Sequence, residues 1–210
     1  MSAAGERAAL VDGARALGVL LPEAAAERLL RLLDELVKWN AAYNLTSIRQ
    51  RGQMLTRHLL DSLAIHGDLE GERIADVGTG AGFPGVPLAV ASPERRFTLI
   101  DSNGKKIRFV RQAIRSLELA NVEAVQARAE DLQPAAPFDS ITARACAPLP
   151  ELLKTVAGLA GPGTRVLAMK GRYPQDEIAA VRPPWQIVEA RPLEVPGLDE
   201  ERHLVLLTRS

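Results

Sequence analysis

The sequence predicts an α/β fold in which a helical extension precedes a mostly parallel sheet. Two observations predict it: helical periodicity occupies much of the first 70 residues, and short apolar runs then alternate with helix-like segments. The 210 residues, 47% of them hydrophobic, are enough to bury one core and carry an appendage. We therefore expect an N-terminal helical extension over residues 1–70, packed on a core over residues 71–210.

Apolar spacing predicts the helices of the extension. In the segment 22–40, Leu29, Leu33 and Leu36 recur at intervals of three and four residues, which places them on one helical face. The segment 53–67 is a second amphipathic stretch and ends at Gly67. The polar segment between them, residues 41–52, is expected to be a connection.

Seven apolar runs predict the strands. Five alternate with helix-like segments and indicate parallel strands, at residues 73–78, 96–102, 122–128, 138–145 and 164–171. The last two, at residues 185–195 and 202–210, are joined by a turn that contains Pro196 and Gly197, with no helix between them. They predict an antiparallel hairpin at one edge of the sheet.

Composition narrows the class of protein. Lys plus Arg and Asp plus Glu each number 26, so overall charge neither favours nor excludes a nucleic acid partner, and clustering of charge has to decide. The single cysteine, Cys146, fits a reducing compartment. No signal-peptide or membrane-span pattern is present, so we expect a cytoplasmic monomer without membrane association. The three histidines lack metal-site spacing, and we expect no metal.

The stretch ADVGTGAGFPGVP, residues 75–87, predicts a ligand-binding loop after the first strand. Gly78, Gly80 and Gly82 remove three side chains, which lets the backbone approach a ligand beside the N-terminus of the next helix. A plain strand-to-helix turn would usually need one glycine. We expect Gly78 and Gly80 to contact the ligand.

The surroundings of this loop indicate which ligand it binds. Phe83 stands where the dinucleotide fingerprint has its third glycine, and no P-loop motif is present. Asp101 ends the second strand, where a carboxylate can accept hydrogen bonds from both ribose hydroxyls. These features suggest an adenosine without pyrophosphate, such as S-adenosylmethionine. Asp76 could meet its cationic methionine end, directly or through water, or could instead partner the following helix N-terminus.

Several segments together resemble a known family. They are KWNAAYNLTSI, RHLLDSL, DVGTGAGFPGVPLA, LIDSNGKK, ARAED, FDSITARACAPL, LAMKG and ERHLVLLTR. From about Leu36 to the end, the chain resembles the bacterial methyltransferases that modify guanine N7 in small-subunit (16S) ribosomal RNA, also called glucose-inhibited division protein B. The resemblance implies a class I, Rossmann-like methyltransferase fold whose mostly parallel seven-stranded sheet has a C-terminal antiparallel strand. It also implies S-adenosylmethionine as cofactor, and small-subunit rRNA or the 30S particle as partner.

The resemblance implies roles for individual residues. Asp101 would serve the ribose, and the pair Ala129 and Glu130 would border the adenine. Cofactor contacts are implied at Gly78, Phe83, Ala129, Glu130 and Arg144. The sequence departs from the family at Asn103, where leucine is usual, and at Lys106, where arginine is commoner. The first departure bears on the adenine pocket and not on the fold.

The chemistry of guanine N7 makes some absences informative. N7 carries an in-plane lone pair and no proton, so methyl transfer needs alignment and electrostatics but no general base. The Asp/Asn-Pro-Pro-aromatic motif of exocyclic-amine methyltransferases is replaced by RACAPLP after the fourth strand. Cys146 lies in that segment without the context of a cysteine nucleophile, and we expect it to be a small buried residue.

Two basic residues end neighbouring strands. Arg144 is the candidate catalytic residue, because its guanidinium at the carboxyl end of the fourth strand could position the base by bonding guanine O6 or by stacking. Alternatively it forms a salt bridge with Glu130 or Asp139. Lys170 ends the fifth strand and faces the same edge, where it could contact a phosphate.

Basic side chains gather on the helix predicted over residues 104–117. At about 100° per residue, Lys105, Arg108 and Arg111 share one face, which carries no acidic residue. An ordinary solvated face is the alternative, but such a face usually mixes both signs of charge. A second polar set precedes the core and includes Asn40, Arg57 and His58. We expect both sets to bind structured RNA through phosphates and stacked bases.

Three other functions remain open at this point. A nicotinamide-dependent oxidoreductase is disfavoured by Phe83, and a non-catalytic RNA-binding assembly factor by the intact cofactor loop. A small-molecule methyltransferase is disfavoured by the basic helix.

Overall fold

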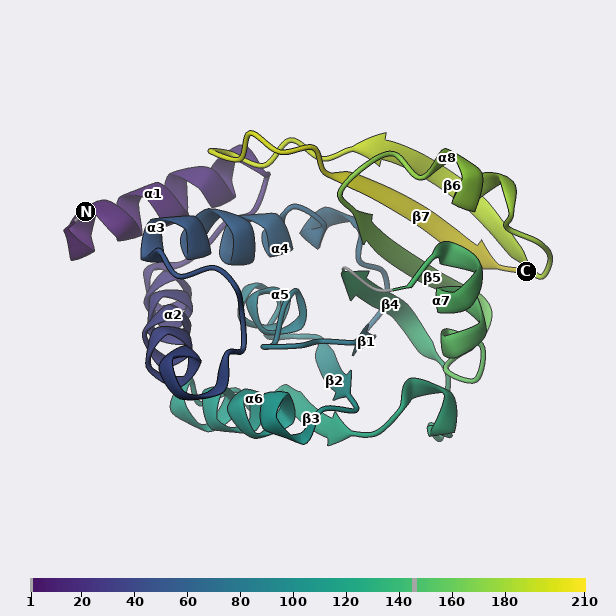
Figure 1. Cartoon of the computed structure of the whole chain (residues 1–210), viewed down its shortest axis with the longest axis horizontal. Helices are drawn as coiled ribbons and strands as arrows, with labels where there is room; N and C mark the ends of the chain where they lie inside the picture. The colour runs from purple at the N-terminus through teal and green to yellow at the C-terminus, as the bar shows by residue number, and fades with distance from the viewer. Residues whose placement is uncertain (1, 145–146) are drawn as a thin grey trace.

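The strands form one sheet in the order β3-β2-β1-β4-β5-β7-β6. It is seen in Figure 1, in a computed structural model that describes residues 2–144 and 147–210. The strands are β1 (Arg73–Val77), β2 (Arg96–Asp101), β3 (Val122–Gln126), β4 (Phe138–Arg144), β5 (Ala160–Lys170), β6 (Trp185–Pro192) and β7 (His203–Arg209). β1 to β5 are parallel, and β7 is antiparallel to both β5 and β6. The predicted mostly parallel seven-stranded sheet is confirmed.

The N-terminal region is helical, as predicted. It contains α1 (Ala3–Ala16), α2 (Glu23–Tyr43), α3 (Arg51–Met54), the π-helical η1 (Leu55–Leu60), α4 (Asp61–Leu63) and the 3-10 turn η2 (His66–Asp68). The helices of the core are α5 (Gly85–Ala91), α6 (Gly104–Ser116), α7 (Leu149–Val156) and α8 (Gln175–Ala179), with a 3-10 turn, η3 (Ala129–Asp131). The segment predicted as one helix over 53–67 thus begins at residue 51 and passes through a π-helical turn.

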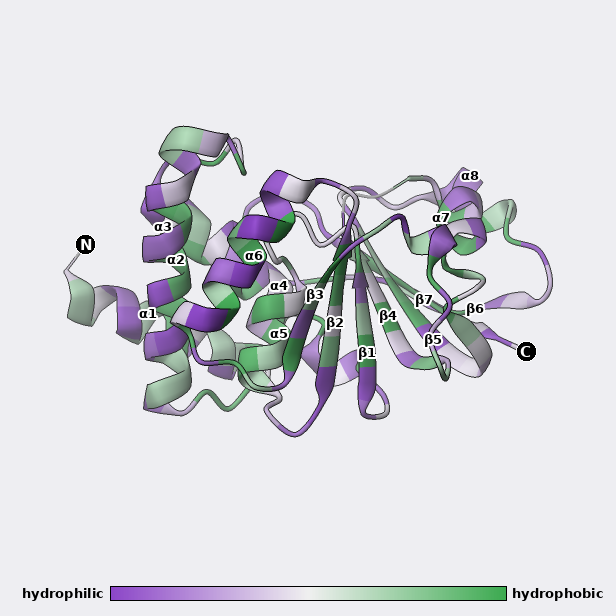
Figure 2. Ribbon diagram, turned by 90° about the horizontal axis from the view of Figure 1, so that it is seen from below, coloured by the Kyte–Doolittle hydropathy of each residue, from purple (hydrophilic) through white to green (hydrophobic). Residues whose placement is uncertain are grey.

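The sheet has a core on each face because strand side chains alternate between the faces. Ile74 and Leu99 join the larger core, which also contains Leu29 of α2 and Phe109 of α6. Val77 belongs to the second core, where α7 packs. Figure 2 shows the N-terminal helices beside α5 and α6, and α7 and α8 at the other end of the sheet. The helical extension therefore shares a core with the sheet.

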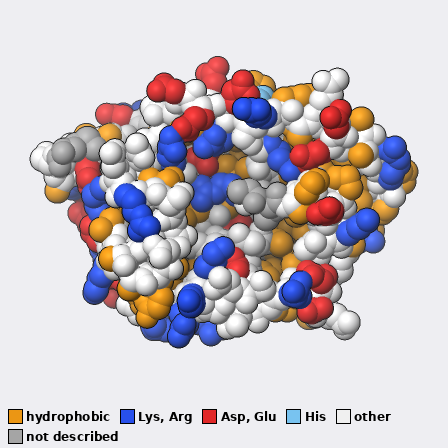
Figure 3. Space-filling model, in the orientation of Figure 1, with side chains coloured by type: hydrophobic (Ala, Val, Ile, Leu, Met, Phe, Trp, Pro, Cys, Tyr) orange, Lys and Arg blue, Asp and Glu red, His pale blue; other side chains and the backbone are white. Residues whose placement is uncertain are grey.

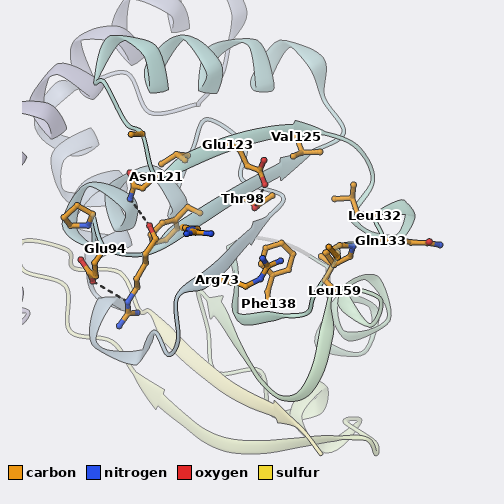
Figure 4. Close-up of a pocket in the computed structure, with 18 residues that line it drawn as sticks. Arg73, Glu94, Thr98, Asn121, Glu123, Val125, Leu132, Gln133, Phe138 and Leu159 are labelled. Carbon is orange, nitrogen blue, oxygen red and sulfur yellow. Dashed lines mark hydrogen bonds and ion pairs between the residues drawn. The ribbon is translucent and has the colours of Figure 1, made fainter.

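The segment between β3 and β4 contains only η3. A cavity of about 730 Å³ lies between this segment and the strands β2 and β3, and Thr98, Glu123 and Phe138 are among the residues that line it (Figure 4). Its residues come largely from the amino ends of the strands, and no residue predicted to bind the cofactor lines it. We therefore do not assign the site to this cavity.

Within residues 2–144 and 147–210, no helix combines the length and the apolar character that crossing a bilayer requires.

Gly85 offers a test of how tightly the loop after β1 is packed. A Cβ at this position would lie 2.2 Å from Cδ2 of Leu99 and 2.7 Å from Oδ2 of Asp76. We expect Gly85→Ala to lower the free energy of unfolding by about 1–3 kcal/mol, measured by urea denaturation. Gly52→Ala is the control, because a Cβ there meets nothing within 4 Å. Equal stability of the two variants would contradict the packing described.

Candidate active site

The loop after β1 depends on glycine. Gly78, Gly80 and Gly82 have φ angles of 70°, 61° and 87°, which L side chains rarely adopt. The backbone N–H groups of Gly78 and Thr79 donate to the carbonyl oxygen of Ile100 at 2.9 and 3.0 Å, which ties the loop to the end of β2. The three glycines therefore allow the backbone to turn where the first two strands end.

The side chain of Asp76 holds this loop in place by hydrogen bonds. Its carboxylate is fully buried and accepts hydrogen bonds from Thr79 Oγ1 at 2.5 Å, Thr142 Oγ1 at 2.9 Å and the Gly85 N–H at 2.9 Å. Burial raises the pKa of Asp76, while these hydrogen bonds and the charge of Arg144 oppose the rise. The bond to Gly85 places Asp76 at the N-terminus of α5. Its contact with a methionine group stays a prediction.

A cavity of about 250 Å³ lies at the carboxyl ends of β1 and β2. Its lining includes Gly78, Asp101, Ala129 and Glu130, so the structure brings together four residues that the sequence indicated for the cofactor. η3 supplies Ala129 and Glu130 after β3. The cavity therefore lies where open α/β sheets bind their ligands.

Asp101 is held at the edge of this cavity by backbone groups. Its Oδ2 accepts from the Gly80 N–H at 2.9 Å, and its Oδ1 accepts from the Asn103 N–H at 2.8 Å. Each carboxylate oxygen can accept a further hydrogen bond, as a ribose hydroxyl would require. The side chain of Asn103 caps α6 by accepting from the N–H groups of Lys105 and Lys106. Asparagine thus has a structural role where the family usually has leucine.

Phe83 lies in a second cluster, with His58 and Arg144. Its ring stacks on His58 with centroids 4.6 Å apart and an angle of 14° between the rings. Cζ of Arg144 lies 5.5 Å from the Phe83 centroid. Neither Phe83 nor Arg144 lines the 250 Å³ cavity. These two predicted cofactor residues therefore lie in a cluster outside that cavity, in contact with the extension through His58.

His58 is a neutral, buried part of this cluster. Burial, together with the charges of Arg144 and Arg57, lowers the pKa of His58 to about 3. Its Nε2 lies 3.1 Å from Oγ1 of Thr46, and the residue is 6% exposed. His58 was predicted to bind RNA, but in this structure it presents neither charge nor an exposed ring.

Arg144 pairs with an acid that the sequence analysis missed. Its Nη1 donates to Oδ2 of Asp61 at 3.1 Å and to the carbonyl oxygen of Arg57 at 3.0 Å. Of the two partners suggested from the sequence, Asp139 accepts the N–H groups of Glu72 and Arg73, and Glu130 lies 3.5 Å from Arg128. An acidic residue inside the apolar stretch RHLLDSL was the available signal for Asp61.

The residues predicted to bind RNA differ in exposure. Lys105 and Arg108 are exposed on α6 and line a shallow depression with Gln126. Arg111 is also exposed, although its guanidinium donates to the carbonyl oxygen of Ala124. Figure 3 shows Lys and Arg side chains, interspersed with Asp and Glu, on the face of the molecule that is seen in Figure 1. All three residues are therefore accessible to a large ligand, although Arg111 is also bonded to the backbone.

Three other predicted RNA contacts are engaged within the protein. Asn40 is 2% exposed, and its Oδ1 accepts the Thr46 N–H at 2.9 Å. Arg57 forms an ion pair with Glu200. Lys170 donates to Glu177 at 2.8 Å and to the Ala147 carbonyl at 3.1 Å. Cys146, the predicted small buried residue, lies outside the described residues.

The comparison with known families agrees with this geometry. Residues 25–205 match the model of the family described as rRNA small subunit methyltransferase G. The chain belongs to this family. The match supersedes the oxidoreductase, the non-catalytic assembly factor and the small-molecule methyltransferase as interpretations.

Curated relatives of the family match nearly the whole chain. The chain is 47% identical over 201 residues to ribosomal RNA small subunit methyltransferase G of Marinobacter nauticus, covering 96% of this chain and 94% of the relative. It is 49% identical over 189 residues to the namesake from Xanthomonas euvesicatoria, covering 90% and 89%.

Solved structures confirm the predicted class I methyltransferase fold. An O-methyltransferase from Bacillus cereus, in complex with SAH, has a TM-score of 0.60 and 21% identity, covering 86% of this chain and 91% of its own. The magnesium protoporphyrin IX methyltransferase of Synechocystis, with bound SAM, has a TM-score of 0.58 and 13% identity, covering 85% and 97%. At these identities the likeness concerns the fold alone.

The lowered pKa of His58 predicts a pH dependence of stability. Between about pH 6.5 and pH 3 the unfolded chain binds a proton at His58 and the folded chain does not, so stability falls as the pH falls. We expect the wild type to lose about 1–2 kcal/mol more than His58→Gln between pH 7 and pH 5, by urea denaturation. The other histidines are common to both proteins. Parallel losses would show that His58 titrates normally.

Proposed function

We propose that this enzyme transfers the methyl group of S-adenosylmethionine to N7 of a specific guanine in small-subunit ribosomal RNA. Membership in the rRNA small subunit methyltransferase G family is the observation that carries the proposal. The cavity at the carboxyl ends of β1 and β2 supports it, because it joins a glycine loop to an acidic residue at the end of the second strand.

The residues at this cavity fit S-adenosylmethionine. Asp101 would accept hydrogen bonds from the ribose hydroxyls, and Ala129 with Glu130 would border the adenine. Gly78 and Gly80 let the backbone approach closely, and there is no third fingerprint glycine for a pyrophosphate. When bound, the cofactor supplies an electrophilic methyl group on a positively charged sulfur. That charge suits the buried carboxylate of Asp76 beneath the loop.

The acceptor, guanine N7, has to be positioned by the protein but does not have to be deprotonated. Guanine N7 has no proton to remove, so the protein has to hold the base in line and stabilise the charge redistribution. Arg144 is the group proposed to orient the base, because its planar guanidinium can bond O6 or stack. His58 supports this chemistry only through packing, since it is buried and neutral.

The exposed basic face of α6 is the proposed RNA contact. Lys105 and Arg108 line the depression at the N-terminus of α6, close in sequence to Asp101, the residue proposed to bind the ribose, and Arg111 follows on the same helix. Arg57 and Lys170 would join only after exchanging their acidic partners for phosphates. We further propose that the 30S particle or its RNA is the partner, and that the enzyme acts as a monomer in the cytoplasm.

The direct test uses labelled S-adenosylmethionine and small subunits that lack the modification. We expect labelled methyl to enter the small-subunit RNA, and reduction followed by aniline cleavage to locate it at one guanine. Large subunits are the control and should remain unlabelled. If the RNA is labelled but is not cleaved by aniline, the acceptor is an atom other than guanine N7. If no label enters the RNA, the proposal is wrong.

The basic face of α6 has its own test. Changing Arg108 and Arg111 to Glu should weaken RNA binding and reduce its salt dependence by about one unit of slope for each phosphate that the variant no longer binds. The affinity for S-adenosylmethionine, measured by calorimetry, should not change. The control reverses two exposed arginines elsewhere, Arg96 of β2 and Arg182 of the segment between α8 and β6, with the same change in net charge. Equal RNA affinity of the two double variants would refute the assignment.

A further inference from the structure

Asp61 joins three parts of the chain. It is the first residue of α4 and is 2% exposed. Its Oδ2 accepts from Nη1 of Arg144, at the end of β4, and its Oδ1 accepts from Nε of Arg202, just before β7, both at 3.1 Å. A single carboxylate therefore holds guanidinium groups that are distant in sequence.

The contacts of Arg144 restrict where its guanidinium can lie. Nη1 donates both to Asp61 and to the carbonyl oxygen of Arg57, which lies one turn earlier in the same helical segment. On another side, the Phe83 ring lies 5.5 Å from Cζ. Two directional hydrogen bonds and one aromatic face leave the planar guanidinium few alternative orientations.

The carboxylate of Asp61 is shared between two guanidinium groups. It pairs with Arg144 and with Arg202, and Arg202 also has Glu200 at 3.7 Å from its Nη2. Arg144 in turn interacts electrostatically with the buried carboxylate of Asp76. Asp61 therefore fixes the guanidinium of Arg144 at the end of β4 by an ion pair that is also hydrogen-bonded.

We propose that Asp61 is a positioning residue of the methyl transfer, which orients Arg144 toward the guanine. The inference rests on the proposed function of Arg144 and adds that the helical extension completes the active site. Asp61 acts through Arg144 and is not proposed to touch the substrate. Removing its charge should therefore impair the orientation of the base more than its binding.

A second ion pair provides a matched control. Asp68 of η2 accepts from Nη2 of Arg191 with both carboxylate oxygens at 2.8 Å, and so also links the extension to the C-terminal strands. Its partner belongs to β6 at the outer edge of the sheet. Asp68→Asn removes the same charge from a comparable bridge, away from the residues assigned to the site.

The experiment compares Asp61→Asn, Asp68→Asn, Arg144→Lys and the double variant Asp61→Asn/Arg144→Lys in the full chain. kcat and KM are measured for methylation of unmodified small subunits at saturating S-adenosylmethionine, below the melting temperature of every variant. We expect Asp61→Asn to lower kcat roughly tenfold to hundredfold with little change in KM, and Asp68→Asn to match the wild type.

The double variant separates positioning from general stability. If Asp61 acts through Arg144, adding Asp61→Asn to Arg144→Lys should lower kcat by less than about threefold further. Additive losses, or equal kcat for Asp61→Asn and Asp68→Asn, would overturn the proposal. If Asp61→Asn does not fold, Asp61→Glu keeps the charge but moves it by a methylene group. Asp61→Glu should also lower kcat, and an unchanged kcat for this variant would likewise overturn the proposal.

A spectroscopic readout distinguishes this inference from the proposed function. The guanidinium signal of Arg144 in ¹⁵N NMR, assigned by its loss in Arg144→Lys, should be shielded from solvent exchange in the wild type. It should exchange faster in Asp61→Asn and not in Asp68→Asn. An inactive wild type with this exchange pattern would refute the rRNA substrate alone. Unchanged exchange in Asp61→Asn would refute the positioning role, whatever the substrate.

Discussion

The buried carboxylate of Asp76 is the interaction on which the rest of the site depends. It receives hydrogen bonds from the glycine loop, from β4 and from the first residue of α5, so it sets the spacing of three elements at once. Its burial is costly for a charge, and three donors together with the nearby Arg144 offset that cost. The loop can then present its backbone to a nucleoside, because the hydrogen bonds of Asp76 to Thr79 and Gly85 fix its shape.

The helical extension contributes to the site as well as to the core. η1 supplies His58, which stacks on Phe83, and α4 supplies Asp61, which holds Arg144. The glycine loop, through Phe83, and β4, through Arg144, are therefore both held by residues of the helical extension. Without the extension, Phe83 and Arg144 would lack these neighbours. Because the extension shares the larger hydrophobic core with the sheet, His58 and Asp61 are held in fixed positions beside them.

Local patterns in the sequence predicted the strands and the position of the glycine loop well. Strand periodicity and glycine positions depend on neighbouring residues, and the carboxyl ends of parallel strands meet at one edge, so Asp101 lies beside the glycine loop as expected. Ala129 and Glu130, which also line the cavity, were expected from the family resemblance and not from a local pattern. The sequence did not indicate which polar residues would be buried. Asn40, His58 and Asp61 acquire partners from elements that folding alone brings near, and no local spacing encodes the pairs Asp61–Arg144 and Asp61–Arg202.

The antiparallel insertion of β7 between β5 and β6 has a consequence for the order of assembly. Among the described strands, β6 pairs only with β7, and β7 follows β6 in the chain. During synthesis, β6 therefore has no sheet neighbour until β7 has been made, and Asp61 lacks its second guanidinium partner until Arg202 has been made. The β6 edge of the sheet and the Asp61–Arg202 ion pair are therefore late steps in the assembly of the described fold.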